Sequence, residues 1–430
     1  MFELSSNVKS LKIKESLKLT KEKRKSQICL VRELKINTAH LGKKQLEQLR
    51  MLFIEAKWLR NAILGSDDIH TFNIGKKLSS VKGLDKAGNI EDKPIQYLSS
   101  QMKQSVYEQI KCDMMSLAAK KKKGCIVGKL GFVSEVSSIN LKQYDITYKI
   151  LAYGIKLQGF KRKLKVHGLH QLLADYEFAN AKLIKKPSGY YIKVTCYTNC
   201  EQNATSSKSN TQVAVGLDFG IKTSITTSDA DKFDISIKET ASLKKAQRSL
   251  FKKQKGSNNR YKARIKIRSE YEKITNRRMD KANQIIGMLK HTYSTIYLQD
   301  ENIKGWHKGL FGKQVQSSAL GTIKSKLISN GAVLIDRFAP TTKQCHGCGS
   351  MVVISLDERI FKCTCGYEEN RDIKAAKTIL YYGVNGLHLK KIPMERRELS
   401  IASNACGDNV RPASNRRQLS TKQEAPTMVH

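Results

Sequence analysis

The sequence predicts a multidomain α+β protein with two lobes, from three observations. The chain has 430 residues, 40% of them hydrophobic, which is enough for two or three cores. Apolar residues recur at helical spacing before Gly124 and alternate with polar residues from about Ser137, so helices precede strands. After Val213, short apolar runs alternate with helical segments, as in a mixed sheet flanked by helices.

The net charge of the chain indicates what kind of molecule it binds. Lys and Arg number 78 against 38 Asp and Glu, a formal net charge of +40, which favours binding to nucleic acid. A ribosomal-type or membrane-surface protein is the alternative, although no amphipathic basic helix or lipidation signal dominates. No apolar run of about 18 residues and no signal-peptide core occurs in the sequence, so we expect an intracellular, cytoplasmic protein.

The amino-terminal half is predicted to join a small β-barrel to a helical insert. Helical periodicity predicts two helices, separated by an exposed loop from Ser66 to Lys93. The run Ile28–Leu34 and the alternating segments around Tyr144 and Tyr191 are typical of strands. The predicted boundaries are 1–27 for a basic, flexible N-terminus, 28–40 and 125–200 for the barrel, 41–124 for the insert and 201–212 for a linker.

Two apolar runs of the carboxy-terminal half contain acids at or near their ends. Asp218 interrupts the strand-like run Val213–Gly220, and Asp300 and Glu301 close the run that begins at Thr295. A buried carboxylate is costly unless it is paired or binds metal; the alternative for Asp218 is a turn-capping role at the strand end. Strand alternation places Asp300 and Glu301 on opposite faces, so only one of them can meet Asp218.

A third acid, Asp372, opens a predicted helix and shares a face with Ala375 and Ala376. Small alanines let such a helix lie close to a sheet, although an acid in the first turn can also serve only the helix dipole. Taken together, Asp218, Glu301 and Asp372 predict a two-Mg²⁺ centre in which Asp218 bridges the cations and metal-bound water attacks a phosphodiester. The acids therefore indicate a metal-dependent nuclease.

Four cysteines, Cys345, Cys348, Cys363 and Cys365, lie within twenty-one residues. Thiolates at turns with nearby glycines predict one structural Zn²⁺. The second pair has one intervening residue instead of two, so four free thiols, or His346 in place of one ligand, remain alternatives.

A basic run between Lys244 and Lys281 carries fifteen Lys or Arg against three acids, on two predicted helices broken at Gly256–Asn259. Such a density of one charge predicts contact with a phosphate backbone, and the alternative is a solvated helical face. Tyr261 and Tyr271 either stack on bases or pack locally. The candidate nucleic-acid-binding residues are Lys252, Lys253, Lys255, Arg260, Lys262, Arg264, Arg277 and Arg278.

Several motifs resemble the TnpB family of transposon-encoded proteins, relatives of the miniature type V CRISPR effectors. They are VGLDFGIKT, YLQDENIKGWHKGLFGKQVQ and PTTKQCHGCG through CTCGYEENRDIKAAK, and the upstream segments LGKKQLEQLRMLFIEAKWLRNAIL and EFANAKLIKKPSGYYIKVTCY are also similar. The resemblance implies a wedge β-barrel with a helical recognition insert, followed by an RNase H-like (RuvC) α/β nuclease domain with an inserted zinc ribbon. The implied boundaries are 213–340 and 366–386 for the nuclease domain, 341–365 for the ribbon and 387–430 for a flexible tail.

The resemblance also implies an RNA-guided DNA endonuclease. A guide RNA from the transposon end would pair with the target, the amino-terminal lobe would read a short adjacent motif, and one RuvC-like site would cut both strands of DNA. The expected protein is monomeric and nucleoid-associated when bound to DNA. Two alternatives remain: an RNA-guided DNA-binding regulator without cleavage activity, and a transposase that joins strands with the same chemistry.

The second acid departs from the family pattern. Asp218 matches the first catalytic acid and Asp372 the third, but many members place the second acid where this chain has Gln299. In the QDEN variant of the motif, the Glu beside Asn302 is the natural candidate, so we predict Glu301, with Asp300 as the substitute. If neither acid reaches the metals, the protein is expected to bind without cutting.

Overall fold

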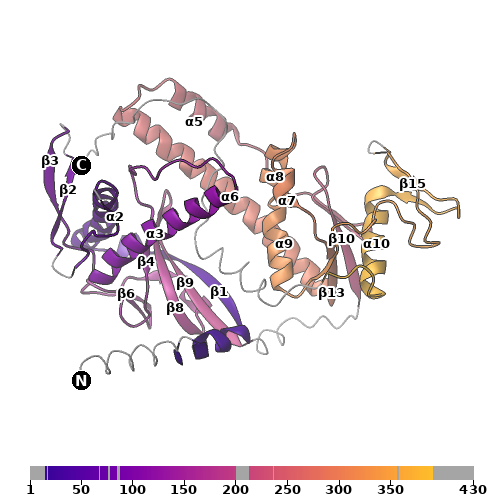
Figure 1. Ribbon diagram of the computed structural model, residues 1–430, viewed down its shortest axis with the longest axis horizontal. Coiled ribbons are helices and arrows are strands. Elements are labelled where there is room, and N and C mark those ends of the chain that lie inside the picture. Colours follow the sequence, from indigo (N-terminus) through magenta and orange to yellow (C-terminus); the bar gives the residue numbers. More distant parts are fainter. Residues whose placement is uncertain are drawn as a thin grey trace. The chain divides into compact units, whose positions relative to one another are not determined.

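The computed structural model describes residues 15–16, 18–66, 68–75, 78–84, 88–199, 213–235, 237–355 and 358–390. The chain divides into two compact units (Figure 1). The described part of the first unit lies before residue 200 and also takes in 252–265, and the second unit takes in the rest. Among the described helices, none is both long and apolar enough to cross a bilayer.

The first unit is built on a five-stranded sheet with the strand order β4-β8-β9-β1-β7. All its neighbours pair antiparallel, and alternate residues Ile192, Val194 and Cys196 of β9 are buried, as the period of two predicts. The strands and short 3-10 helices of this unit are β1 (Gln27–Ile36), η1 (Thr38–His40), β2 (Ser80–Leu84), β3 (Ile90–Pro94), β4 (Ser138–Leu141), β5 (Tyr148–Leu151), β6 (Gly154–Leu157), β7 (Val166–His167), η2 (Leu169–Gln171), β8 (Glu177–Lys186) and β9 (Gly189–Asn199).

Both predicted helices of the insert are confirmed, as α2 (Lys43–Leu64) and α3 (Ser100–Lys122). Their apolar stripes share one hydrophobic core with the five-stranded sheet. The carboxylate of Glu55 on α2 is also buried, and it accepts hydrogen bonds from the backbone N–H groups of Gln96, Tyr97 and Leu98. These bonds tie α2 to the segment that leads into α3.

The structure differs from three predictions for the amino-terminal half. Within the described residues the sheet is open, with β4 and β7 at its edges, because no ladder joins those strands, so the predicted barrel does not close. The predicted loop 66–93 contains most of the β2–β3 hairpin; these strands bury little besides Val81 and so give no alternating pattern. Within the predicted flexible N-terminus, residues 18–25 are helical, and Arg24 donates to Glu177 at 2.7 Å. The predicted linker 201–212 lies outside the described residues.

The second unit contains the predicted mixed sheet, in the order β12-β11-β10-β13-β14. Strands β10, β13 and β14 run parallel, and β11 is antiparallel to β10. The elements of this unit are β10 (Ala214–Phe219), β11 (Ile225–Thr227), β12 (Lys232–Phe233), α5 (Ala241–Phe251), α6 (Asn258–Thr292, which begins among residues grouped with the first unit), β13 (Thr295–Gln299), α7 (Ile303–Trp306), α8 (Gly312–Ser318), α9 (Leu320–Ser329), β14 (Val333–Ile335), β15 (Ile360–Lys362), β16 (Glu368–Asn370) and α10 (Arg371–Val384).

Different helices cover the two faces of this sheet. Val215 and Leu217 of β10 share a core with residues of α6 and α9, whereas Tyr297 of β13 packs with residues of α10. Gly216 faces α10, and a Cβ there would overlap the backbone of Ala376 and Leu380. Helix α10 can therefore approach β10 closely only because residue 216 has no side chain, and Figure 1 shows α10 beside β10.

Three expectations for the second unit are wrong in detail. The sequence pattern of 312–330 predicts one helix, but the structure breaks it into α8 and α9 at Ala319, whose φ is 56°. The apolar runs 352–354 and 360–362 predict a hairpin between the cysteine pairs, but β15 pairs with β16 instead. The predicted tail is ordered at its start, since Leu389 forms a bridge with Ile335 and the N–H of Lys390 donates to the carbonyl of Leu334; backbone pairing at the sheet edge needs no apolar periodicity. Residues 391–430 lie outside the described residues.

Candidate active site

Asp218 lies near the end of the central strand β10, on the face that is covered by α10. It is two residues from Gly216, so both residues point to the same side of the sheet. Burial, followed by the charges of Asp372 and Glu301, raises the pKa of Asp218 to about 8, and Arg371 acts in the opposite direction. The charges of Asp372, in the first turn of α10, and of Glu301, in the turn after β13, therefore act on Asp218 of β10. Among the described residues, only the four cysteines lie close enough together to be identified as a metal-binding group.

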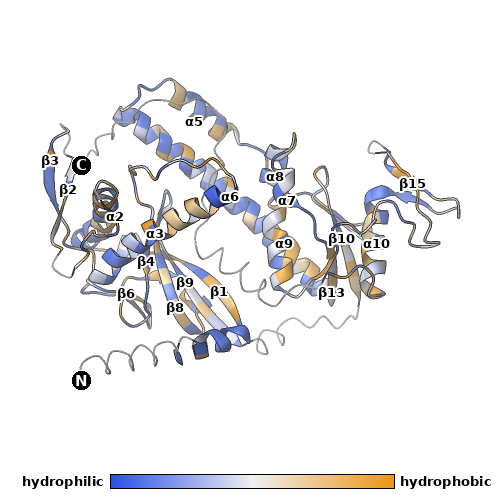
Figure 2. Ribbon diagram, in the orientation of Figure 1, coloured by the Kyte–Doolittle hydropathy of each residue, from blue (hydrophilic) through white to orange (hydrophobic). Residues whose placement is uncertain are grey.

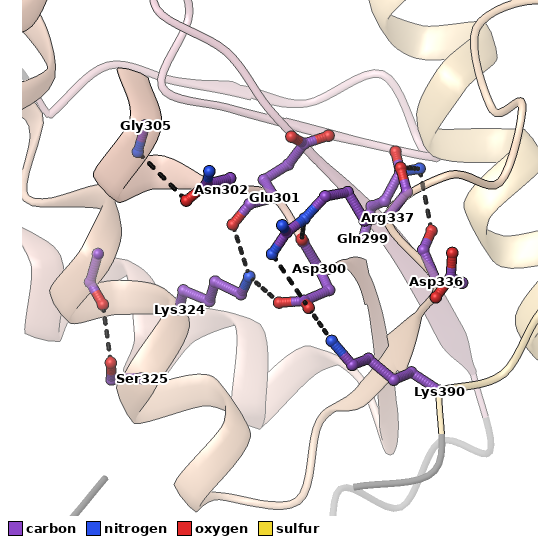
Figure 3. A network of polar contacts seen from close by, with 11 residues as sticks. Gln299, Asp300, Glu301, Asn302, Gly305, Lys324, Ser325, Asp336, Arg337 and Lys390 are labelled. Carbon is purple, nitrogen blue, oxygen red and sulfur yellow. Dashed lines mark hydrogen bonds and ion pairs between the residues drawn. The ribbon is translucent and has the colours of Figure 1, made fainter. Parts of the chain in front are cut away.

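The adjacent acids Asp300 and Glu301 are directed to opposite sides of the chain. Figure 3 shows the carboxylate of Glu301 turned away from that of Asp300. Glu301, and not Asp300, acts on the pKa of Asp218. Burial raises the pKa of Glu301 against the effects of Lys324 and Arg337. Of the two candidates for the second acid, the geometry favours Glu301.

Asp300 is held by cations of the chain itself (Figure 3). Lys324 of α9 donates to one of its carboxylate oxygens at 2.5 Å, and Lys390 pairs with the other. Arg337 donates to the carbonyl oxygen of Asp300 at 3.0 Å. Burial would raise the pKa of Asp300, but the bonds from Lys324 and Lys390 outweigh it and hold that pKa below its usual value. Asp300 is therefore a structural ion-pair partner.

Gln299, in the register where many family members have the second acid, is buried and fully engaged. Its side-chain amide donates to the carbonyls of Asp336, Arg337 and Ala339 at 2.9 to 3.2 Å. Its Oε1 accepts from the hydroxyl of Thr341 at 2.8 Å. A carboxylate at this position would face three carbonyl oxygens, so these contacts select an amide.

Sequence reasoning missed two cationic residues near the carboxylates. Arg371 lies 3.9 Å from a carboxylate oxygen of Asp372 and lowers the pKa of Asp218. Lys374, two residues after Asp372, is fully buried. No sequence signal marks its burial, because Lys374 lies one and two residues before the alanines and so is off their stripe. A buried Lys is rare unless it has a partner.

The four predicted cysteines come together. Their sulfur atoms all lie within 4.8 Å of one another, with Cys345 to Cys365 at 3.9 Å and Cys348 to Cys363 at 3.4 Å. Tetrahedral zinc, with Zn–S bonds of about 2.3 Å, sets sulfur atoms about 3.8 Å apart. The cluster, which we call the zinc knuckle, therefore fits a structural zinc ion. His346 is outside this set, and its ring packs edge-on against Tyr367.

The predicted nucleic-acid-binding residues lie on α6 and on the segment before it, where blue predominates in Figure 2. Most of them are exposed; the exceptions are Arg260 and Arg278. Arg260 donates to the carbonyl of Lys253 at 2.8 Å, and Arg278 donates to the carbonyl of Gln316 of α8 at 2.9 Å. Both guanidinium groups therefore have local roles. Tyr261 is exposed, whereas the hydroxyl of Tyr271 accepts from Gln247 of α5.

Comparisons with known proteins agree with this architecture. The family model described as "Probable transposase" (OrfB_IS605) matches residues 195–308, and the one described as "Cas12f1-like, TNB domain" matches residues 321–379. A Streptomyces pristinaespiralis protein named "Putative RNA-guided DNA endonuclease" is 32% identical over 239 residues. That match covers 52% of this chain and 55% of the relative, so the chain spans about half of the relative's length.

Residues 195–308 are thus similar to a probable transposase, and residues 321–379 to a Cas12f1-like TNB domain. Together with the relative, these matches support the resemblance of the carboxy-terminal half to the TnpB family.

Proposed function

We propose that this protein is an RNA-guided DNA endonuclease that hydrolyses phosphodiester bonds of double-stranded DNA. The name of the relative supports the general activity. The observation that carries the proposal is that the charges of Asp372 and Glu301 both act on the carboxylate of Asp218. Carboxylates that repel one another in one partly buried place are suited to binding divalent cations.

Two Mg²⁺ ions, held by Asp218, Glu301 and Asp372, would supply a nucleophilic water and stabilise the departing 3′ oxygen. The chain's own contribution is to direct two lysines to Asp300 and away from the Glu301 carboxylate, while Arg371 lies 3.9 Å from Asp372. Lys324 and Lys390 are occupied by Asp300 on the other side of the turn, so they do not neutralise Glu301 through a direct ion pair. The fold of this domain would be RNase H-like, since its five strands combine a parallel trio with two further strands added through antiparallel pairs.

The exposed cations before and along α6 would contact the sugar–phosphate backbone of the guide or the target. Lys252, Lys253, Lys255, Lys262, Arg264 and Arg277 are exposed, and base pairing, not these residues, would read the sequence. The amino-terminal unit would recognise the short motif beside the target. The zinc ion would stabilise the knuckle and take no part in the chemistry.

A second candidate function, guided binding without cleavage, is favoured by one observation. The position at which many family members have the second acid is Gln299, whose neutral amide is engaged by three backbone carbonyls and by the hydroxyl of Thr341. Under this alternative, Glu301 would not complete the metal centre, and the complex would occupy its target without cutting it.

One experiment separates the two functions. RNA that copurifies with the expressed protein is sequenced, and the complex is then incubated with a plasmid library carrying the matching target beside randomised flanks, with Mg²⁺ or with EDTA. Endonuclease activity predicts linear product with Mg²⁺ only, and its loss in Asp218→Ala while target binding persists. Stable target binding by the unmodified protein without any linear product would contradict the endonuclease proposal.

A further inference from the structure

We propose that Lys374, Thr341 and Gln299 form a positioning relay through which zinc occupancy of the knuckle controls the placement of Asp372 and Glu301. The inference rests on the proposed function, which names these carboxylates as metal ligands. None of the three residues touches the metals in this scheme. They connect the knuckle to the two elements on either side of Asp218.

The first contact of the relay is between Lys374 of α10 and β15, the strand that leads directly into Cys363 of the knuckle. The ammonium of Lys374 lies 4.2 Å from the centroid of the buried ring of Phe361, on β15. This contact with the ring offsets part of the cost of burying an ammonium. A shift of β15 would therefore disturb Lys374.

Zinc would fix the position of this ring. Cys363 directly follows β15, so zinc ligation would anchor the end of that strand, whereas a metal-free knuckle would not. Because Lys374 lies two residues from Asp372 on the same helix, its position constrains the first turn of α10.

The second contact runs from Lys374 to the end of β13. The ammonium donates to the carbonyl of Thr341 at 3.0 Å, and the hydroxyl of the same Thr341 donates to Gln299. Both Thr341 and Gln299 are buried, so these bonds are shielded from water. Gln299 also holds the segment after β14 through three carbonyls and lies two residues before Glu301. The relay thus ends beside the second acid.

The test uses the full-length protein with zinc bound and Mn²⁺ as the probe of the carboxylates. Mn²⁺ affinity is measured by electron paramagnetic resonance, and zinc release is followed with a coloured chelator. Groups that position metal ligands typically change affinity by about tenfold or more. Lys374→Met is therefore expected to weaken Mn²⁺ binding about tenfold and to speed zinc release. Removing zinc from the unmodified protein should weaken Mn²⁺ binding similarly, and removing it from Lys374→Met should add little.

Lys377→Met is the matched control. Lys377 lies on the same helix, and it pairs with Glu369 of β16 at 2.7 Å. It has no bond to Thr341 among the described contacts. Its substitution is expected to leave Mn²⁺ affinity unchanged. Equal Mn²⁺ affinity in the unmodified protein, Lys374→Met and Lys377→Met would overturn the relay.

A second variant keeps the test decisive if Lys374→Met does not fold or if zinc removal unfolds the chain. Thr341→Val removes only the hydroxyl bond to Gln299 and keeps the carbonyl that accepts from Lys374. Losing one buried hydrogen bond predicts a fall in Mn²⁺ affinity of about threefold with zinc still bound, and no change would overturn the relay.

Cleavage of target DNA separates this inference from the proposed function. If Mn²⁺ affinity follows zinc occupancy but DNA is not cut, the endonuclease proposal fails and the relay stands. If DNA is cut with Mg²⁺ but Mn²⁺ affinity does not change on zinc removal, in Lys374→Met or in Thr341→Val, the relay is wrong and the endonuclease proposal stands. If the unmodified protein binds no Mn²⁺ at its carboxylates, both fail.

Discussion

Asp300 and Asp218 show what distinguishes a structural acid from a candidate metal ligand. Both lie at the ends of neighbouring parallel strands. Asp300 is surrounded by Lys324, Lys390 and Arg337, so its pKa is lowered. The pKa of Asp218 is raised first by burial and then by the charges of Asp372 and Glu301. The Asp300 carboxylate already has cationic partners, whereas the Asp218 carboxylate would gain from a bound cation. Burial and partners together, not residue type, therefore distinguish the two acids.

The largest expected effect is on catalysis by Asp218→Asn. Metal ions stabilise such transition states by several kcal/mol, so cutting should fall at least about a thousandfold. Because the substitution removes a carboxylate that is repelled by Glu301 and Asp372, the melting temperature in EDTA should stay level or rise. Plasmid linearisation and thermal melting measure the two outcomes. Retained cutting would show that Asp218 is not a metal ligand.

The opposite pattern is expected for Asp300→Asn. Breaking a buried ion pair costs about 3–5 kcal/mol, and because the Asp300 side chain is 13% exposed we expect about 2–3 kcal/mol after allowance for screening. Urea denaturation measures this loss, and Mg²⁺-dependent cutting by the folded fraction should persist. Glu368→Gln, which removes an exposed pair with Lys362, is the control and should change stability by less than about 1 kcal/mol. Loss of cutting without loss of stability would make Asp300 the second acid.

Gln299→Glu tests whether residue 299 could provide the second acid in place of Glu301. The new carboxylate would face three carbonyl oxygens, and such unpaired burial costs about 1–3 kcal/mol or more. Unfolding should therefore become easier, with no gain in Mn²⁺ affinity. A tighter Mn²⁺ site in this variant would mean that residue 299, and not Glu301, provides the better position for the second acid.

The pH dependence of stability is a smaller effect. The folded-state pKa of Asp218 lies above its unfolded value of 3.8 and rises to about 8, so the folded state binds the extra proton between these values. The stability of the metal-free protein should therefore fall as pH rises from about 4 to 8. Asp218→Asn should reduce this slope, and Mg²⁺ should oppose it. Melting curves across this pH range, with and without Mg²⁺, measure it; an unchanged slope in the variant would contradict the assignment.

The smallest effect concerns the basic residues of α6. Lys262→Gln should reduce the slope of log affinity against log salt by about one or less, because Lys262 is exposed. Arg278→Gln should change that slope less and lower stability instead, since its guanidinium is bonded to Gln316. Filter-binding titrations at several salt concentrations compare them. Equal slopes for both variants would argue against this division.

Much of the fold could be predicted because its strongest signals are local. The apolar stripes of α2 and α3 and the alternation in β9 appear directly in the sequence. The β2–β3 hairpin and the bridge from Leu389 to Ile335 could not be predicted, because backbone pairing forms them without an apolar pattern. The break at Ala319 has no Gly or Pro signal.

The candidate site was partly predictable for a similar reason. Cysteine spacing predicted the cluster of four cysteines, which the structure brings together, whereas the metal-binding roles of Asp218 and Asp372 stay predictions. The choice of Glu301 over Asp300 depended on which residue Lys324 and Lys390 bind, and these lie 24 and 90 residues away from Asp300. The role of Gln299 likewise depends on carbonyls beyond β14. Partners so distant along the chain leave no pattern near the residue itself.

Residue 216 carries no functional group, yet it sets a dimension of the metal centre. Even a methyl group there would displace α10 outward, and Asp372 would move with it. Gly216→Ala would therefore be expected to impair catalysis through distance alone, with every metal-binding side chain still in place.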